Sequence, residues 1–150
     1  MISIRIGLFE TNSSSVHVLV IPKDTDIHIP SHVNLYGGDY DWGPDSEDDT
    51  IQYFYQACKD MGKDELNKFF AYLSRKNIDF EEMSIKTKYF GGIDHVEELP
   101  LEELFNNENL LDRFLFGTGS YIDIGNDNCD NSPSDEDYDL DKYDIIIKTN

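Results

Sequence analysis

The sequence predicts a single α+β domain, with strands at both ends of the chain and helices between them. Strand-like apolar segments lie near both termini, at residues 2–9, 16–22, 120–124 and 143–149. Between them, apolar side chains recur at the three- and four-residue spacing of amphipathic helices. We therefore expect one domain over residues 1–150, in which a mixed or antiparallel sheet packs against a central helical hairpin and short helices.

The N-terminal part of the chain holds the first predicted strands. "ISIRIGLF" alternates, with three isoleucines on one face, and Gly7 ends it. "VHVLVIP" is apolar on both faces, which is typical of a strand buried within a sheet, and Pro22 ends it. "HVNLY" fits a short strand before an acidic loop at about residues 37–49.

The middle of the chain predicts a helical hairpin. Asp49 or Thr50 suits the N-cap of a first helix, and Gly62 suits its C-cap. A second helix follows over about residues 64–76, and the short connection makes the two helices neighbours. After the hairpin, "IKTKYF" at residues 85–90 is a strand candidate.

Two shorter helices precede the last strands. Pro100 opens the first, and Asn107 caps the second, which Gly117 and Gly119 end. "SYIDI" and "YDIIIKT" then follow as strands, separated by an acidic loop at about residues 126–142. This order completes the α+β pattern.

Charge is the strongest signal in the composition. The 12 basic and 31 acidic residues give a formal net charge of −19. Residues 39–49 hold six acids and no base, and residues 123–144 hold nine acids and one base. Such a chain repels DNA, RNA and anionic membranes, so direct nucleic-acid or membrane binding is not expected. Basic protein grooves or metal cations are the partners that this charge favours.

The segment "FETNSSSVH" raises the question of a catalytic serine. Ser15 and His17 are two residues apart and would face the same side of a strand, where a contact between them is feasible. The serines nevertheless precede the strand and lack the glycines of the G-x-S-x-G elbow. The favoured interpretation is a structural turn that opens a buried strand, with His17 as a hydrogen-bonded core residue.

The segment "FGTGS" permits a tight turn whose backbone N–H groups could donate hydrogen bonds to a phosphate. It lacks the lysine of a P-loop. A nucleotidyltransferase-like turn is the other interpretation of Ser120, but the strand after it carries Asp123 without a second acid two positions on. The Gly-Ser turn therefore favours architecture over catalysis.

A metal-dependent phosphoryl-transfer or hydrolytic enzyme is the second hypothesis. Carboxylate and imidazole side chains of the kind that bind hydrolytic metals occur at Glu10, His17, Asp94, His95 and Asp127. In this hypothesis the catalytic set is Glu10, Ser15, His17, Asp94, His95 and Ser120, and the metal ligands are His17, His95 and Asp127. No histidine pair has helical i, i+4 spacing, so local capping by Asp94 and His95 is the simpler interpretation.

Three segments together resemble a set of small proteins encoded in bacteriophage genomes. They are "FETNSSS" with His17 after it, "IDH" at residues 93–95, and "FLFGTGSYIDIGNDN". The matching positions are Glu10, Asn12, Ser13, Ser14, Ser15, His17, Asp94, His95, Gly119, Ser120, Asn126 and Asp127. The resemblance covers a minority of the chain and carries no established activity with it. It implies a phage or prophage origin.

A phage origin gives the acidity a meaning, because phages counter CRISPR and restriction nucleases with small acidic proteins that occupy nucleic-acid channels. We therefore expect an anti-CRISPR or other anti-defence inhibitor that acts as a DNA mimic in a basic groove of a host nuclease. The expected partner-binding residues are Asp39, Asp41, Trp42, Asp45, Glu47, Asp48, Asp49, Asp130, Asp135, Glu136, Asp137, Tyr138, Asp139 and Asp141. Interleaved aromatic residues would anchor such an interface.

The remaining expectations concern location and assembly. The start of the sequence lacks the pattern of a signal peptide, and no apolar run reaches the length of a membrane span. We expect a protein of the host cytoplasm without a cofactor. A virion or scaffold component is a third hypothesis, and it predicts stable self-assembly.

Overall fold

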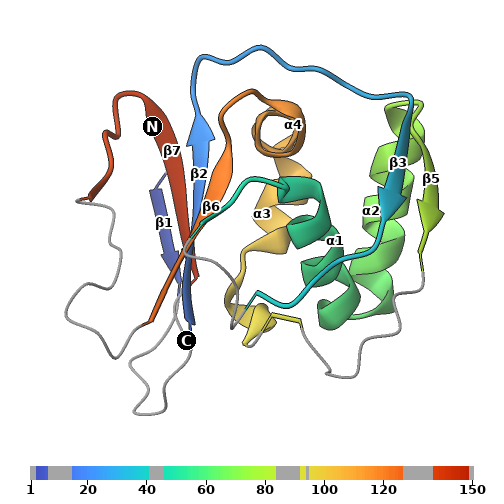
Figure 1. The fold of residues 1–150 in the computed structure, drawn as a ribbon, viewed down its shortest axis with the longest axis horizontal. Helices are drawn as coiled ribbons and strands as arrows, with labels where there is room; N and C mark the ends of the chain where they lie inside the picture. Colours follow the sequence, from blue (N-terminus) through green and yellow to red (C-terminus); the bar gives the residue numbers. More distant parts are fainter. Residues whose placement is uncertain are drawn as a thin grey trace.

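The computed structural model describes residues 3–6, 15–40, 46–83, 92–93, 95–126 and 137–148. A five-stranded sheet and a two-stranded sheet lie on opposite sides of the helices (Figure 1). The larger sheet combines strands from both ends of the chain, and the helices come from its middle. This is the α+β fold that the sequence predicts.

The five-stranded sheet has the order β1-β7-β2-β6-β4. Its strands are β1 (Ser3–Ile6), β2 (Ser15–Pro22), β4 (Ser46–Glu47), β6 (Tyr121–Asn126) and β7 (Tyr143–Lys148). β2 is antiparallel to both β6 and β7, whereas β1 joins the far side of β7 in parallel. The sheet is therefore mixed, with the longest strand at its centre.

The apolar sequence of β2 explains this central place. Leu19 and Ile21 belong to the core cluster that includes helix residues, whereas Val16, Val18 and Val20 belong to a second cluster with residues of β7. All five side chains are at most 2% exposed. Both faces of β2 are covered, as continuous apolar strands require.

The helices form a hairpin and a pair of shorter segments. They are α1 (Thr50–Met61), α2 (Lys63–Arg75), the 3-10 helix η1 (Val96–Glu98), α3 (Leu101–Asn106) and α4 (Glu108–Phe116). Gly62 alone separates α1 from α2 and has a φ of 142°, which favours glycine. The side chain of Asn107 accepts a hydrogen bond from the backbone N–H of Leu110 and so caps α4, as predicted.

The main core lies between the helices and the larger sheet. Phe54 of α1 is at its centre and makes edge-to-face contacts with Phe69, Phe105 and Phe114, at ring-centroid distances of 5.3, 5.4 and 6.5 Å. These contacts join α1 to α2, α3 and α4. Within the described part of the chain, none of these helices combines the length and apolarity needed to cross a membrane.

The opposite face of the sheet is covered from the acidic loop. Tyr138 and Leu140 pack against the second cluster, with Tyr121 and Tyr143 beside them. The described part of the loop therefore has a structural role as well as a charge, because it shields β2 and β7 from water.

The two-stranded sheet consists of β3 (His32–Leu35) and β5 (Asp79–Glu82), which run parallel. The sequence predicts β3 but not β5, because "DFEE" lacks the composition of a strand. A contact between distant segments stabilises this strand instead, because the Phe80 ring stacks on Phe70 of α2 at a centroid distance of 4.5 Å. The two-residue strand β4 was also not predicted, and the candidate strand at 85–90 lies outside the described residues.

A buried ion pair fastens α4 to the larger sheet. The guanidinium of Arg113 donates to Asp144 Oδ2 at 2.9 Å and to the carbonyl of Pro22 at 3.1 Å. The two charged side chains are only 12% and 5% exposed. One side chain of α4 thus bonds to residues of both β2 and β7.

We expect Asp144→Ala to lower the free energy of unfolding by about 3–5 kcal/mol, since it leaves the Arg113 charge buried without its carboxylate. The double variant Arg113→Met, Asp144→Leu should lose much less, because it removes both charges and keeps the volume. Urea unfolding measures both values. An equal loss in the two variants would contradict this account of the pair.

Candidate functional site

His17 is a core residue. It lies on β2 and is 0% exposed. Its Nδ1 atom lies 2.6 Å from the hydroxyl of Tyr53 on α1, and the Tyr53 ring in turn meets Tyr40 edge to face at 4.9 Å. The histidine of the ETNSSS-x-H segment is thus buried against Tyr53 of α1.

This environment keeps the imidazole neutral. Burial and, to a lesser extent, the positive charge of Lys148 together lower the pKa of His17 from its ordinary 6.5 to about 3, against the opposing effect of a hydrogen bond to the Tyr40 backbone. A group with that pKa is a poor proton acceptor near neutral pH. Catalysis by His17 as a general base is therefore disfavoured.

Lys148, which we did not single out from the sequence, is the unexpected member of this cluster. It is the cross-strand neighbour of His17 on β7, and its side chain is 0% exposed. Lysine is almost never fully buried. The period of two along "YDIIIK" places residue 148 on the same face as Ile146, which faces the main core, so the sequence did contain a signal for this position.

Strand ends that border the sequence motifs meet at one end of the larger sheet. Ile6 and His17 both pair with Lys148, and Ser15 pairs with Asn126. The ends of β1, β6 and β7 and the start of β2 therefore lie together, on the lower side of Figure 1, where the C-terminus is marked. Two motif segments that are far apart in the sequence adjoin the sheet at this end.

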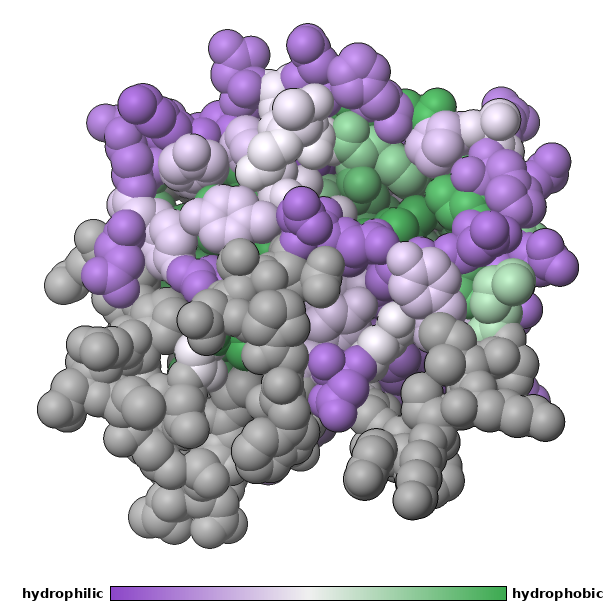
Figure 2. Space-filling view, viewed as in Figure 1, coloured by the Kyte–Doolittle hydropathy of each residue, from purple (hydrophilic) through white to green (hydrophobic). Residues whose placement is uncertain are grey.

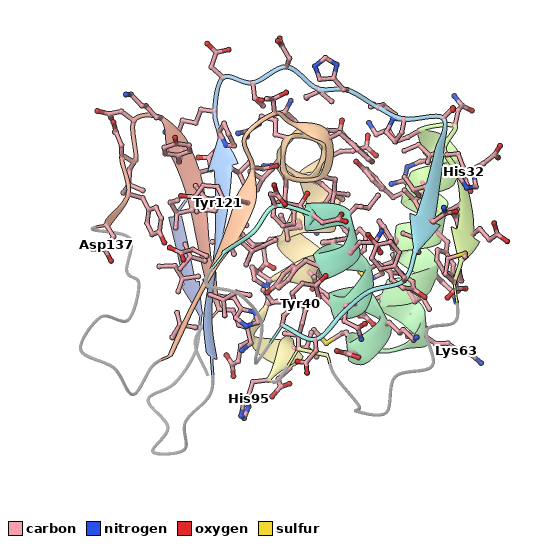
Figure 3. All side chains as sticks on the ribbon, in the orientation of Figure 1. His32, Tyr40, Lys63, His95, Tyr121 and Asp137 are labelled. Carbon is pink, nitrogen blue, oxygen red and sulfur yellow. The ribbon has the colours of Figure 1, made fainter. Side chains whose placement is uncertain are left out.

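His95 lies at the start of η1. It adopts a left-handed conformation with a φ of 51°, and its carbonyl accepts a hydrogen bond from the N–H of Glu98. Its ring Nδ1 lies 3.5 Å from Glu97 Oε1. Figure 3 shows the labelled side chain at the lower edge of the molecule. His95 is thus the N-cap residue of η1, without a side-chain capping hydrogen bond, and Asp94 lies outside the described residues.

Ser120 closes the C-terminus of α4. Its hydroxyl donates to the carbonyl of Phe114 at 2.7 Å, and the side chain is 7% exposed. A side chain at Gly117 would collide with the carbonyl of Arg113, since its Cβ would lie 2.3 Å away. The N–H groups of Gly117 and Thr118 already donate to other carbonyls. The Gly-Ser turn therefore serves helix termination, and two of its donors are not available to a phosphate.

The metal hypothesis finds no assembled site among the described residues. Within that part of the chain, no group of three histidine, cysteine, aspartate or glutamate side chains is placed to hold a metal ion. Glu10, Asp94 and Asp127 lie outside the described residues, and for Ser15 only the backbone is described. Of the proposed ligands and catalytic residues, His17, His95 and Ser120 have the local roles given above.

The predicted partner-binding residues are described in part. Asp39, Asp48, Asp137, Asp139 and Asp141 are exposed. Asp49 is half-buried and accepts a hydrogen bond from the Tyr36 hydroxyl at 2.9 Å. Outside the described residues lie Asp41, Trp42, Asp45, Asp130, Asp135 and Glu136, and for Glu47 only the backbone is described.

Tyr138 is half-buried rather than an exposed anchor. Its hydroxyl donates to Asp123 Oδ2 at 2.6 Å, and its ring packs against the outer face of the sheet. Burial, then the hydrogen bond to Asp123, raise the pKa of the tyrosine hydroxyl. The loop alternates from residue 137 to 141, with Tyr138 and Leu140 inward and three aspartates outward.

Charge on the described surface is unevenly distributed. Exposed cationic side chains are Lys59, Lys63, Lys68 and Arg75 on the α1–α2 hairpin and Lys142 beside the sheet. The hairpin also exposes Asp60 and Asp64. The rest of the described surface exposes many carboxylates: Asp24, Asp26, Asp39, Asp48, Asp79, Glu81, Glu82, Glu97, Glu102, Glu103, Glu108, Asp137, Asp139 and Asp141. Figure 3 shows the labelled Lys63 and Asp137 on opposite sides of the molecule. Hydrophilic residues cover most of the described part of the face in Figure 2.

Cations on the sheet side are engaged locally. Lys23 donates to the carbonyl of Leu140 at 2.7 Å, Arg113 bonds Asp144, and Lys142 lies 4.0 Å from Asp139. Lys23 and Lys142 thus both lie at the loop of residues 137–141, which exposes three aspartates. The carboxylate-rich surface around them is the candidate interaction site.

Comparison of the sequence and structure with family models, curated proteins and solved structures found no match.

We expect His17→Gln to flatten the pH dependence of stability. As the pH falls below about 6.5, the unfolded chain binds a proton at His17, whereas the folded chain does not until about pH 3. His17 therefore lowers the unfolding free energy by about 1.4 kcal/mol per pH unit across that window. Urea unfolding between about pH 4 and pH 6 measures the slope.

The comparison uses slopes rather than absolute stabilities, because the substitution also removes the contact with Tyr53. His28→Gln is the matched control, since the His28 side chain is exposed. If His17→Gln and the wild type give parallel curves, the neutral buried imidazole is not present in solution.

Proposed function

We propose that this protein is a phage-encoded inhibitor that binds the basic nucleic-acid groove of a host defence nuclease, such as a CRISPR or restriction enzyme. The carboxylates around Asp137, Asp139 and Asp141, beside the larger sheet, would take the place of nucleic-acid phosphates. The observation that carries this proposal is the charge distribution. Among the described residues, four of the five exposed cationic side chains lie on the α1–α2 hairpin, whereas residues 137–142 expose three carboxylates and one lysine. The resemblance of the sequence motifs to phage proteins supports the proposed origin.

The anchoring of residues 137–142 adds support, because fixed carboxylates lose less entropy on binding than mobile ones. The backbone N–H of Lys23 donates to the carbonyl of Lys142 at 2.9 Å, and the side chain of Lys23 reaches Leu140. The Tyr138 hydroxyl ties the same loop to Asp123. Bonds on the inner side of this loop thus hold a row of outward carboxylates.

Burial of two catalytic candidates, His17 and Ser120, also supports binding over chemistry. His17 is enclosed and neutral, and the hydroxyl of Ser120 is occupied by helix carbonyls. A nuclease groove that binds DNA through Lys and Arg attracts a surface of carboxylates by the same long-range electrostatics. Such an encounter is faster at low salt, because mobile ions screen the attraction.

We expect inhibition of the target nuclease to be competitive with DNA and to weaken steeply with salt. Nucleic-acid binders that use several charge contacts lose about a thousandfold or more in affinity between about 50 and 200 mM salt. A competition gel shift with a labelled DNA duplex, repeated across this range, measures the effect. Affinity that stays constant with salt would contradict nucleic-acid mimicry.

The variant Asp137→Asn, Asp139→Asn, Asp141→Asn should weaken nuclease binding by about tenfold or more. Each exposed charge contact contributes about 1 kcal/mol or less, and the variant removes three of them. Asparagine keeps the acceptor that caps the N–H of Asp141. The matched control is Asn67→Lys, Ala71→Lys, Ser74→Lys, which makes the same change in net charge at exposed positions of α2. Equal weakening by the two triple variants would mean that net charge alone matters, and that the loop is not the contact surface.

A further inference from the structure

β5 has an edge that the described chain does not cover. The N–H groups of Asp79 and Met83 donate to the carbonyls of Ser31 and Leu35, at 2.9 and 2.7 Å. Because strand residues alternate in direction, the N–H and C=O groups of Phe80 and Glu82 point away from β3. Among the described strands, β3 is the one partner of β5, and β5 forms the outer end of the molecule in Figure 1.

The opposite edge of this small sheet is closed. Gln52 of α1 is 4% exposed, and its side chain bonds to the backbone of β3 and the residues after it, where another strand would otherwise pair. Its amide donates to the carbonyl of Asn34 at 2.6 Å. Its side-chain oxygen accepts from the N–H groups of Tyr36 and Gly37 at 2.8 and 3.0 Å. One edge of the ribbon is thus occupied by a buried side chain, and the other edge faces outward.

The side chains along β5 define what a third strand would need. Asp79 and Glu81 are exposed and lie on one face. On the other face, Phe80 stacks on Phe70 of α2, and both rings are only partly buried. Met83, which is 45% exposed, extends the apolar surface past the end of β5.

We infer that β5 accepts an extended basic peptide of a partner protein as an added strand. Lys or Arg side chains at alternate positions of that peptide would lie beside Asp79 and Glu81, and apolar side chains between them would lie on Phe70 and Phe80. A second copy of this chain fits poorly, because pairing β5 with itself would bring these carboxylates together. This surface is on the hairpin side and is independent of the proposed contact through residues 137–141.

The test uses a synthetic peptide of about six residues that alternates Lys and Val, since strands of that length are common. Amide proton exchange, followed by NMR, reports on the N–H groups of Phe80 and Glu82. We expect both to become protected from exchange when the peptide binds. A peptide of the same sequence with N-methyl groups on alternate residues, along the edge that would face β5, should not bind.

Glu82→Pro removes one outward N–H without touching the bonds of Asp79 and Met83 to β3. Glu82→Ala is its control, because both variants lose the hydrogen bond that Glu82 accepts from Tyr55. We expect Glu82→Pro to bind the peptide about three- to tenfold more weakly than Glu82→Ala, as one backbone hydrogen bond predicts.

Three results would overturn the inference. Unchanged amide exchange at Phe80 and Glu82 would mean that no peptide strand is added, and that the role of Asp79 and Glu81 is to prevent pairing at this edge. Equal binding of the methylated and unmethylated peptides would mean attraction by charge alone. Protection without peptide that increases with protein concentration would mean that a second copy occupies the edge. The triple Asn variant of residues 137, 139 and 141 should leave peptide binding unchanged, which separates this inference from the proposed inhibitor.

Discussion

β2 constrains the rest of the structure, because both of its faces must be covered. The helices cover one face, and Tyr138 and Leu140 of the acidic loop cover the other. The alternation from Asp137 to Asp141 follows from this requirement: apolar residues turn toward β2, and carboxylates must turn toward water. Hydrophobic burial therefore fixes the position of the surface to which we assign partner binding.

With a net charge of −19, the chain has too few basic side chains to pair with all of its carboxylates, so some must be held by neutral hydrogen-bond donors. Tyrosine hydroxyls provide one: Tyr55 donates to Glu82 and Tyr138 to Asp123, each at 2.6 Å. Tyr72 does the same for Asp112, which also pairs with Lys76. Such bonds satisfy carboxylates without neutralising them, so the protein keeps its negative field while fixing these side chains in place.

Strong local patterns in the sequence predicted most of the fold. The helical stripes, the Asn107 cap and the apolar runs of β2 and β7 depend on residues close together in the chain. β5 and the parallel pairing of β1 depend on contacts between distant segments, which no local pattern contains. The candidate site shows the same division. The acidity of residues 137–141 could be predicted, whereas the burial of Lys148 beside His17 and the contact of Tyr138 with the sheet require the register of β2, β6 and β7.

The proposed function requires that carboxylates of one loop meet a cationic groove of the nuclease. Carbodiimide labelling of carboxylates, read by mass spectrometry on the complex with the target nuclease, tests this most directly. The account predicts that Asp137, Asp139 and Asp141 lose labelling in the complex, while Asp64, which is exposed on α2, stays as reactive as in the protein alone. Unchanged labelling of residues 137–141 in a complex that inhibits the nuclease would contradict it.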